Sequence, residues 1–310
     1  MKPLRNNFLI LIAIGSLMLA GACKSGQKES TVLIEDVSHT TSEDRLHSFS
    51  QIIHLYPSPA EMLSVIDFTE ISYNAALLNP IEKADQYLDS KRQTFALGMY
   101  LTDLAYNALF GRHVETLDYL EVVKSLAADI NINEAVDESM IEQVKNNVEF
   151  LDSLYNISNE AFINILSFCE RNDRSNTVVM LSAGAFTESL YLAVQMIEDF
   201  STADHILQHL ADQKYTIDNF MLFARGLGSD DPGVVSTLKD LEEIKSIFDG
   251  IEPGSGDISI KSATPEEKNH PKKLVIGASG AGSQPHLSEE DFEALRAAVV
   301  ELRNKSVEIN

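Results

Sequence analysis

The chain has 310 residues, of which 47 are acidic and 24 basic, and its formal net charge is −23 at pH 7. A negative field of this size repels nucleic acid and anionic lipid headgroups, which excludes a nucleic-acid-binding protein. Hydrophobic residues make up 44 % of the chain, enough for a core, and its two cysteines, Cys23 and Cys169, are too few for a disulfide framework.

The N-terminus has the pattern of a lipoprotein signal. Basic residues within the first five precede an apolar run over 8–20, and two small residues then come directly before Cys23. This run is shorter than the roughly 20 residues that a transmembrane helix needs. We therefore expect a signal peptide over residues 1–22 and acylation of Cys23, with palmitate-like chains holding the protein on a membrane. An uncleaved N-terminal anchor is the alternative.

A polar segment, 23–50, follows and is rich in Ser, Thr, Glu and Asp. This composition is typical of a flexible tether. A helical domain is expected over 51–250, where apolar residues recur at spacings of three and four and no strand-like alternation occurs. The expected helices cover residues 59–78, 80–89, 92–110, 113–130, 137–172 (as two helices), 175–200, 203–213, 217–227 and 232–250.

Capping residues mark several of these helix ends. Ser58, Asp137, Asp173 and Asp231 are suited to be N-caps, because their side chains can accept a hydrogen bond from a free backbone N–H. Gly111 is suited to end the helix over 92–110.

The helix expected over 175–200 is apolar on nearly all sides. Such a helix belongs in the middle of a bundle. No repeat of 30 to 45 residues is present, which disfavours a helical solenoid. The sequence therefore predicts an all-α fold, a multi-helix globular array around this central helix.

The sequence after residue 250 no longer has the continuous helical pattern of the domain before it. Residues 251–286 are expected to form a linker, in which 257–262 and 272–276 could pair as a short hairpin. The glycine-rich run over 274–282 is similar to a dinucleotide-binding turn, but too few residues follow it for a second strand, so no cofactor is expected. A final helix within 287–310 carries an apolar stripe that should dock on the main domain.

Two carboxylates, Asp103 and Glu188, lie inside the two most apolar helices. A buried carboxylate is costly unless it is neutralised or hydrogen-bonded. Four polar residues nearby in the sequence could serve as partners: Tyr100, Tyr106, Asn107 and Tyr191. One interpretation is a satisfied polar pair that fixes how the helices pack. The other is a small-ligand pocket between the helices. Gly184, one turn before Glu188, indicates a close helix contact or a small cavity.

Two weaker signals concern a possible metal site and a possible nucleophile. His205 and His209 are spaced to share one metal ion on a helix, although solvated surface histidines are the alternative. Cys169 lies in an apolar helical stretch, where a lone cysteine is usually packed in the core rather than nucleophilic.

Several segments together resemble a family of all-helical lipoproteins from Bacteroidetes-type cell envelopes. They are LLNP at 77–80, ALGMYLTDLAY at 96–106, YLEVVKSLAADINI at 119–132, SAGAFTESLYLA at 182–193 and ALRAAVVELRN at 294–304. Asp103, Glu188 and Tyr191 match the family pattern. Four residues depart slightly from it: Leu101, Thr102, Phe186 and Ser189. The resemblance covers about residues 55–305 and implies an exported, membrane-attached helical domain, without implying an activity.

Two functions are compatible with these features. The first is a lipid-anchored, non-enzymatic interaction or scaffold module with a protein partner in the cell envelope. The second is a small-ligand-binding protein or hydrolase that uses Asp103 and Glu188. In lipoproteins of Bacteroidetes-type cell envelopes, acidic residues directly after the acylated cysteine are associated with export to the cell surface. Residues 24–28 lack them, so we expect the outer membrane, facing the periplasm.

Overall fold

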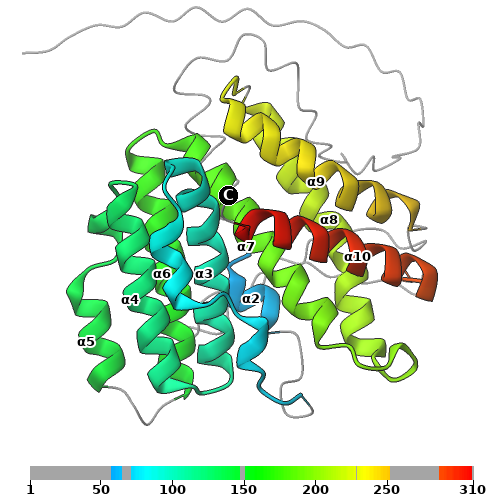
Figure 1. Cartoon of the computed structure of the whole chain (residues 1–310), viewed down its shortest axis with the longest axis horizontal. Coiled ribbons are helices and arrows are strands. Elements are labelled where there is room, and N and C mark those ends of the chain that lie inside the picture. The colour runs from blue at the N-terminus through cyan, green and yellow to red at the C-terminus, as the bar shows by residue number, and fades with distance from the viewer. Residues whose placement is uncertain (1–56, 65–70, 147–150, 228, 252–285, 309–310) are drawn as a thin grey trace, which may run out of the picture. The chain divides into compact units, whose positions relative to one another are not determined.

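The computed structural model describes residues 57–64, 71–146, 151–227, 229–251 and 286–308 (Figure 1). The predicted signal peptide, the tether and the possible hairpin lie outside these residues. Every regular element in the described ranges is a helix, which confirms the all-α fold.

The α-helices are α2 (Pro59–Leu63), α3 (Ser90–Leu109), α4 (His113–Asp129), α5 (Glu138–Asn146), α6 (Leu151–Arg171), α7 (Ser175–Gln195), α8 (Asp204–Gly226), α9 (Pro232–Gly250) and α10 (Glu289–Val307). Short 3₁₀ helices lie between them: η2 (Ala75–Leu77), η3 (Ile81–Gln86), η4 (Asn133–Ala135) and η5 (Phe200–Thr202).

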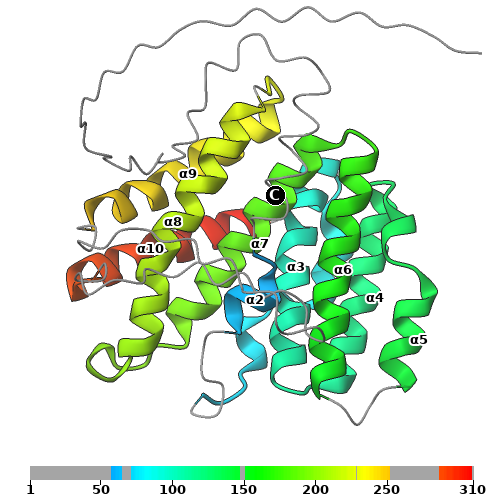
Figure 2. The same ribbon diagram turned by 180° about the vertical axis from the view of Figure 1, so that it is seen from behind.

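The apolar helix α7 lies at the centre, as predicted. It is buried without interruption from Val178 to Val194. Helix α3 packs along it and is covered in turn by α4 and α6, with α5 at the outer edge (Figure 2). Helices α8, α9 and α10 pack on the other side of α7 (Figures 1 and 2). Within the described residues α7 alone is long and apolar enough to cross a membrane, but other helices bury 94 % of that stretch, so it serves as the core helix.

Most of the predicted caps are confirmed. Ser58 accepts a hydrogen bond from the Glu61 backbone N–H, and the Glu61 side chain accepts one from Ser58 in return, which completes a capping box. Asp231 caps α9, and Asp137 accepts hydrogen bonds at the start of α5. Gly111 has a φ of 64°, a left-handed conformation that glycine adopts without strain, and the chain turns there after α3.

Three predicted boundaries are wrong. Asp173 does not cap α7; its φ is 53°, and it forms the turn after α6. Helix α7 ends at Gln195 rather than at residue 200. At this end Arg296 of α10 donates hydrogen bonds to the carbonyl oxygens of Val194 and Ile197, at 3.2 and 2.6 Å. The two helices expected over 203–227 are one helix, α8, since no glycine or proline interrupts it.

The helix expected over 59–78 is also wrong for residues 71–74, which are not helical. Here the chain is held against α3 instead. The Tyr73 hydroxyl donates to Asn107 Oδ1 at 2.9 Å, and the Asn74 N–H donates to the Tyr106 hydroxyl at 3.1 Å. The short helix expected over 80–89 is the 3₁₀ helix η3. This segment thereby brings residues 77–80 against the middle of α3.

Candidate functional site

Helices α3 and α7 cross almost backbone to backbone. A Cβ atom added at Gly98 would lie 2.0 Å from the Leu181 carbonyl oxygen, and one added at Gly184 would lie 2.0 Å from that of Phe95. Thr102 links the helices further, because its hydroxyl donates to the Ala185 carbonyl at 3.2 Å. The close contact expected from Gly184 is therefore present, and it brings the following turns of α3 and α7 together.

Asp103 and Glu188 meet directly beyond this crossing. Both residues have 0 % exposure, and each carboxyl group acts on the pKa of the other. The sequence analysis considers these two residues together, as a polar pair or as a ligand pocket, and the structure places both in one buried cluster.

Asn79 binds the Asp103 side of the pair. Its backbone N–H and its side-chain Nδ2 both donate to Asp103 Oδ2, at 3.1 and 2.8 Å. Asn79 is itself held in place, since the Tyr119 hydroxyl donates to its carbonyl oxygen at 2.7 Å. The Tyr100 hydroxyl likewise donates to the carbonyl oxygen of Pro80 at 2.7 Å. The segment between η2 and η3 is thus fixed over the carboxyl pair.

Arg303 of α10 binds the Glu188 side. Its Nε donates to Oε2 at 3.3 Å and its Nη2 donates to Oε1 at 3.4 Å. Nη2 also donates to the Leu77 carbonyl oxygen at 3.2 Å. The guanidinium lies over the ring of Tyr191, 4.4 Å from its centroid, an arrangement that favours a cation. The C-terminal helix therefore supplies the positive charge of the site.

Burial dominates the electrostatics of this cluster. It raises the pKa of Asp103 well above its ordinary range, and the neighbouring charge of Glu188 raises it further. Burial also raises the pKa of Glu188, but Arg303 opposes that effect. For Arg303, burial works to lower the pKa, and the pairing with Glu188 outweighs it, so this side chain stays charged. The pair thus combines an acid that resists ionisation with one that has a cationic partner.

The tyrosines expected to serve the carboxylates have other roles. Tyr191 contributes through its ring, under Arg303. The Tyr106 hydroxyl accepts from Asn74 and its ring packs on Phe110, with centroids 4.7 Å apart. In the described contacts Tyr106 therefore binds Asn74, and Tyr191 acts on the cluster through Arg303.

Two functional residues, Asn79 and Arg303, were not identified from the sequence. A signal for Arg303 was present, because it follows Phe292 and Val299 at the helical spacing of the buried stripe and so is an arginine on a core-facing side. Nothing local predicts that Asn79 would contact Asp103, since the two are 24 residues apart.

Neither of the best-formed hollows among the described residues is lined by Asp103 or Glu188. The larger, of about 400 Å³, is open and lies between η3 and α4; it is lined by Ile81, Glu82, Ala84, Asp85, Asp118, Glu121, Val122 and Ser125. The smaller, of about 10 Å³, is lined by residues of α2, α7 and α8. The carboxyl pair is therefore packed in by protein.

The two histidines lie one turn apart on α8 in different surroundings. His205 is exposed, whereas His209 lines the smaller hollow and is hydrogen-bonded to the backbone of Met62. Burial lowers the pKa of His209 to about 4. No group of three or more His, Cys, Asp or Glu side chains that could hold a metal ion occurs in the ranges that the structure describes.

Cys169 is a buried free thiol of α6. Burial raises its pKa to about 11, so it is a thiol rather than a thiolate at neutral pH. This environment suits packing and not nucleophilic chemistry.

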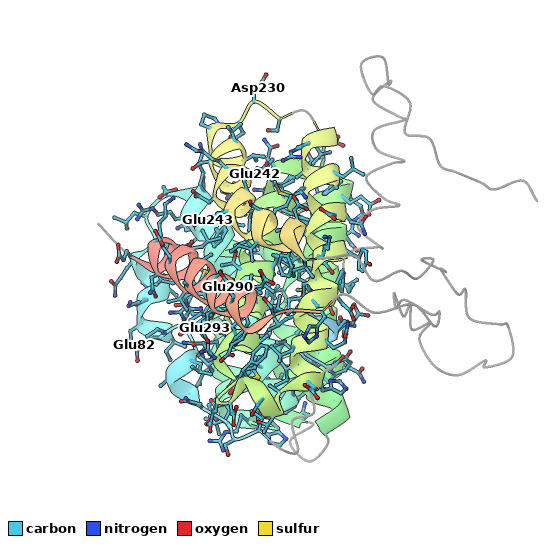
Figure 3. The ribbon with its side chains drawn as sticks, turned by 90° about the vertical axis from the view of Figure 1, so that its right-hand side faces the viewer. Glu82, Asp230, Glu242, Glu243, Glu290 and Glu293 are labelled. Atoms are coloured by element: carbon cyan, nitrogen blue, oxygen red, sulfur yellow. The ribbon has the colours of Figure 1, made fainter. Side chains whose placement is uncertain are left out.

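Acidic side chains lie on the face formed by α9 and α10. Figure 3 shows Glu242 and Glu243 of α9 and Glu290 and Glu293 of α10 on this face. Two of them are paired, Glu242 with Arg225 and Glu293 with Arg296. The charge of this face is therefore partly neutralised within the chain.

Comparison of the chain with models of protein families, with curated proteins and with solved structures gave no match. The resemblance to envelope lipoproteins thus stays a prediction, and the functional argument depends on the residues themselves.

Proposed function

We propose that the protein is a lipid-anchored lipoprotein of a bacterial cell envelope, and that its helical domain is a non-enzymatic interaction or scaffold module. The observation that carries the proposal is the order of features at the N-terminus: basic residues, a short apolar run, two small residues and Cys23. Acyl chains on Cys23 would hold the domain at the membrane surface.

The surroundings of the carboxyl pair support a non-enzymatic role. General acid–base catalysis requires the acid and the base to reach the substrate within hydrogen-bond distance. Asp103 and Glu188 have 0 % exposure and are bound to Asn79 and Arg303. These contacts favour a structural use of both carboxylates over the alternative of a hydrolase or small-ligand site.

The open hollow between η3 and α4 is the best-supported surface for a partner. Its lining combines apolar side chains with four exposed acids: Glu82, Asp85, Asp118 and Glu121. Carboxylates next to apolar side chains complement a basic protein segment with apolar side chains. We infer that the partner in the envelope presents such a segment.

The anchor can be tested by labelling cells with a radioactive or clickable palmitate analogue. We expect incorporation into the wild-type protein and none into Cys23→Ser, which removes the thiol and keeps the size of the side chain. The labelled protein should fractionate with the outer membrane and resist protease added to intact cells. Label that persists in Cys23→Ser would contradict the proposal.

The partner surface can be tested by charge reversal. The double variant Asp118→Lys/Glu121→Lys should lose proteins that cross-link to the wild type in intact envelopes, because both substitutions repel a basic segment. A control, Glu289→Lys/Glu290→Lys, makes the same change of net charge at the start of α10. If both variants recover the same proteins as the wild type, the hollow is not the partner surface.

A further inference from the structure

We propose that the smaller hollow, which residues of α2, α7 and α8 line, is a binding site for one internal water molecule that bridges Ser189 of α7 and Gln213 of α8. The proposal concerns the interior of the helical domain and does not depend on the proposed envelope function.

Two buried polar side chains, Ser189 and Gln213, line this hollow from facing helices. They are 6 % and 7 % exposed. Among the described residues, neither Ser189 Oγ nor Gln213 Oε1 has a hydrogen-bond partner. A buried polar atom that loses its hydration and gains no partner is costly, so both atoms favour a ligand that can hydrogen-bond to them.

The hydroxyl of Ser189 does not make the hydrogen bond that is usual for a hydroxyl inside a helix. Thr187, two residues earlier on α7, donates to the carbonyl oxygen of Ala183, one turn back, at 2.8 Å. The equivalent acceptor for Ser189 is the carbonyl oxygen of Ala185, which accepts from Thr102 of α3 at 3.2 Å. The Ser189 hydroxyl therefore remains available to a ligand in the hollow.

The side-chain amide of Gln213 is oriented by its own helix. Its Nε2 donates to the carbonyl oxygen of His209, one turn back, at 3.3 Å. The opposite orientation of the amide would bring two carbonyl oxygens together, so Oε1 is the end that needs a partner. Since Oε1 can only accept a hydrogen bond, the ligand has to supply a donor.

Size and charge identify the ligand as water. The hollow has a volume of about 10 Å³, and a single water molecule needs ~10–15 Å³ of such space. His209, the third polar side chain of the lining, is neutral at pH 7 because burial lowers its pKa to about 4. Every described residue that lines the hollow is therefore uncharged, which disfavours a bound ion. Water can donate to Gln213 Oε1 and also bind the Ser189 hydroxyl.

Nuclear Overhauser effects between water and the side-chain amide of Gln213 test this site in the full-length protein. Because residues of three helices line the hollow, a water molecule there exchanges far more slowly than surface hydration and gives a cross-peak of the opposite sign. Rotating-frame spectra separate this effect from chemical exchange. We expect the sign of a slowly exchanging water at Gln213 Nε2.

The control in the same sample is Gln208, on the same helix. Its amide donates to Asp212 and is partly exposed, so its cross-peak should have the sign of surface hydration. The proposal is overturned if Gln213 gives the same sign as Gln208 or gives no cross-peak with water.

A double-mutant cycle supplies the second readout. Ser189→Ala removes one partner of the water, and Gln213→Met removes the other while it keeps the length of the side chain. If a water bridges them, Gln213→Met should lower the urea midpoint less in Ser189→Ala than in the wild type. Gln208→Met, the control, should have the same effect in both backgrounds.

Equal losses from Gln213→Met in the two backgrounds would overturn the bridge. Should a variant not fold, the cross-peak of the wild-type protein decides the question alone.

Discussion

His209 is a residue whose charge is set by its surroundings as strongly as that of Asp103. It lies between α2 and α7 next to Gln213, and its hydrogen bond to the backbone of Met62 needs only one imidazole N–H. Because burial lowers its pKa to about 4, the folded protein holds His209 neutral over most of the acidic range. An unfolded chain would protonate it near pH 6.5.

This difference predicts a loss of stability in acid. A folded pKa below the unfolded one means that the unfolded state binds more protons, so the contribution of His209 is complete above about pH 6.5 and lost as the pH falls toward 4. We expect the free energy of unfolding to drop by roughly 1–3 kcal/mol from this residue over that interval. Urea unfolding at a series of pH values would measure it.

A matched pair of variants on the same helix isolates the effect. His209→Gln should flatten the acid dependence between pH 6.5 and 4, whereas His205→Gln, at an exposed position, should leave it unchanged. An equal acid dependence in His209→Gln and the wild type would show that another group causes the loss.

At the scale of helices, the α3–α7 crossing is the contact on which the carboxyl pair depends. Its separation is set by backbone atoms, which cannot move aside as a flexible side chain can. A methyl group at the crossing must therefore push the helices apart and disturb the Asp103–Glu188 contact one turn further along.

We predict that Gly98→Ala and Gly184→Ala each destabilise the protein by about 2–4 kcal/mol, despite the higher helix propensity of alanine. The control is Gly226→Ala at the end of α8, where an added Cβ meets nothing within 4 Å; this variant should be neutral or slightly stabilising. Chemical unfolding measures all three. The crossing is looser than described if Gly98→Ala matches Gly226→Ala.

Helix positions were largely predictable because their signals are local. The caps at Ser58 and Asp231 and the stop at Gly111 act within one turn, and each was identified from neighbouring residues. The segment from 71 to 74 was not predictable, because its hydrogen bonds to Tyr106 and Asn107 reach across 32 and 34 residues and override a helical pattern.

In the candidate site, the two carboxylates were predictable from local sequence, whereas their distant partners were not. Asp103 and Glu188 stand out because a carboxylate inside an apolar helix needs compensation. Their compensation comes from Asn79 and Arg303, and no local pattern says which distant segment supplies it. The contact at Gly98 was not predicted either. A single glycine in a helix indicates that another segment lies close, but it does not identify that segment.

At the scale of the whole chain, its acidic excess leaves exposed carboxylates on more than one surface. Those around the hollow at η3 and α4 are exposed, and so are the labelled glutamates of α9 and α10 (Figure 3), of which Glu242 and Glu293 are paired with arginines. The hollow is also lined by apolar side chains, among them Ile81 and Val122.

The late position of Arg303 in the chain affects how the protein is made. Arg303 is 226 residues from Leu77 and 115 from Glu188, so translation delivers the other members of the cluster well before their cation. Until the last helix leaves the ribosome, the nascent core holds an acid pair without its counterion, which disfavours early compaction. For the exported lipoprotein that we propose, this order of assembly would keep the chain unfolded while it crosses the membrane.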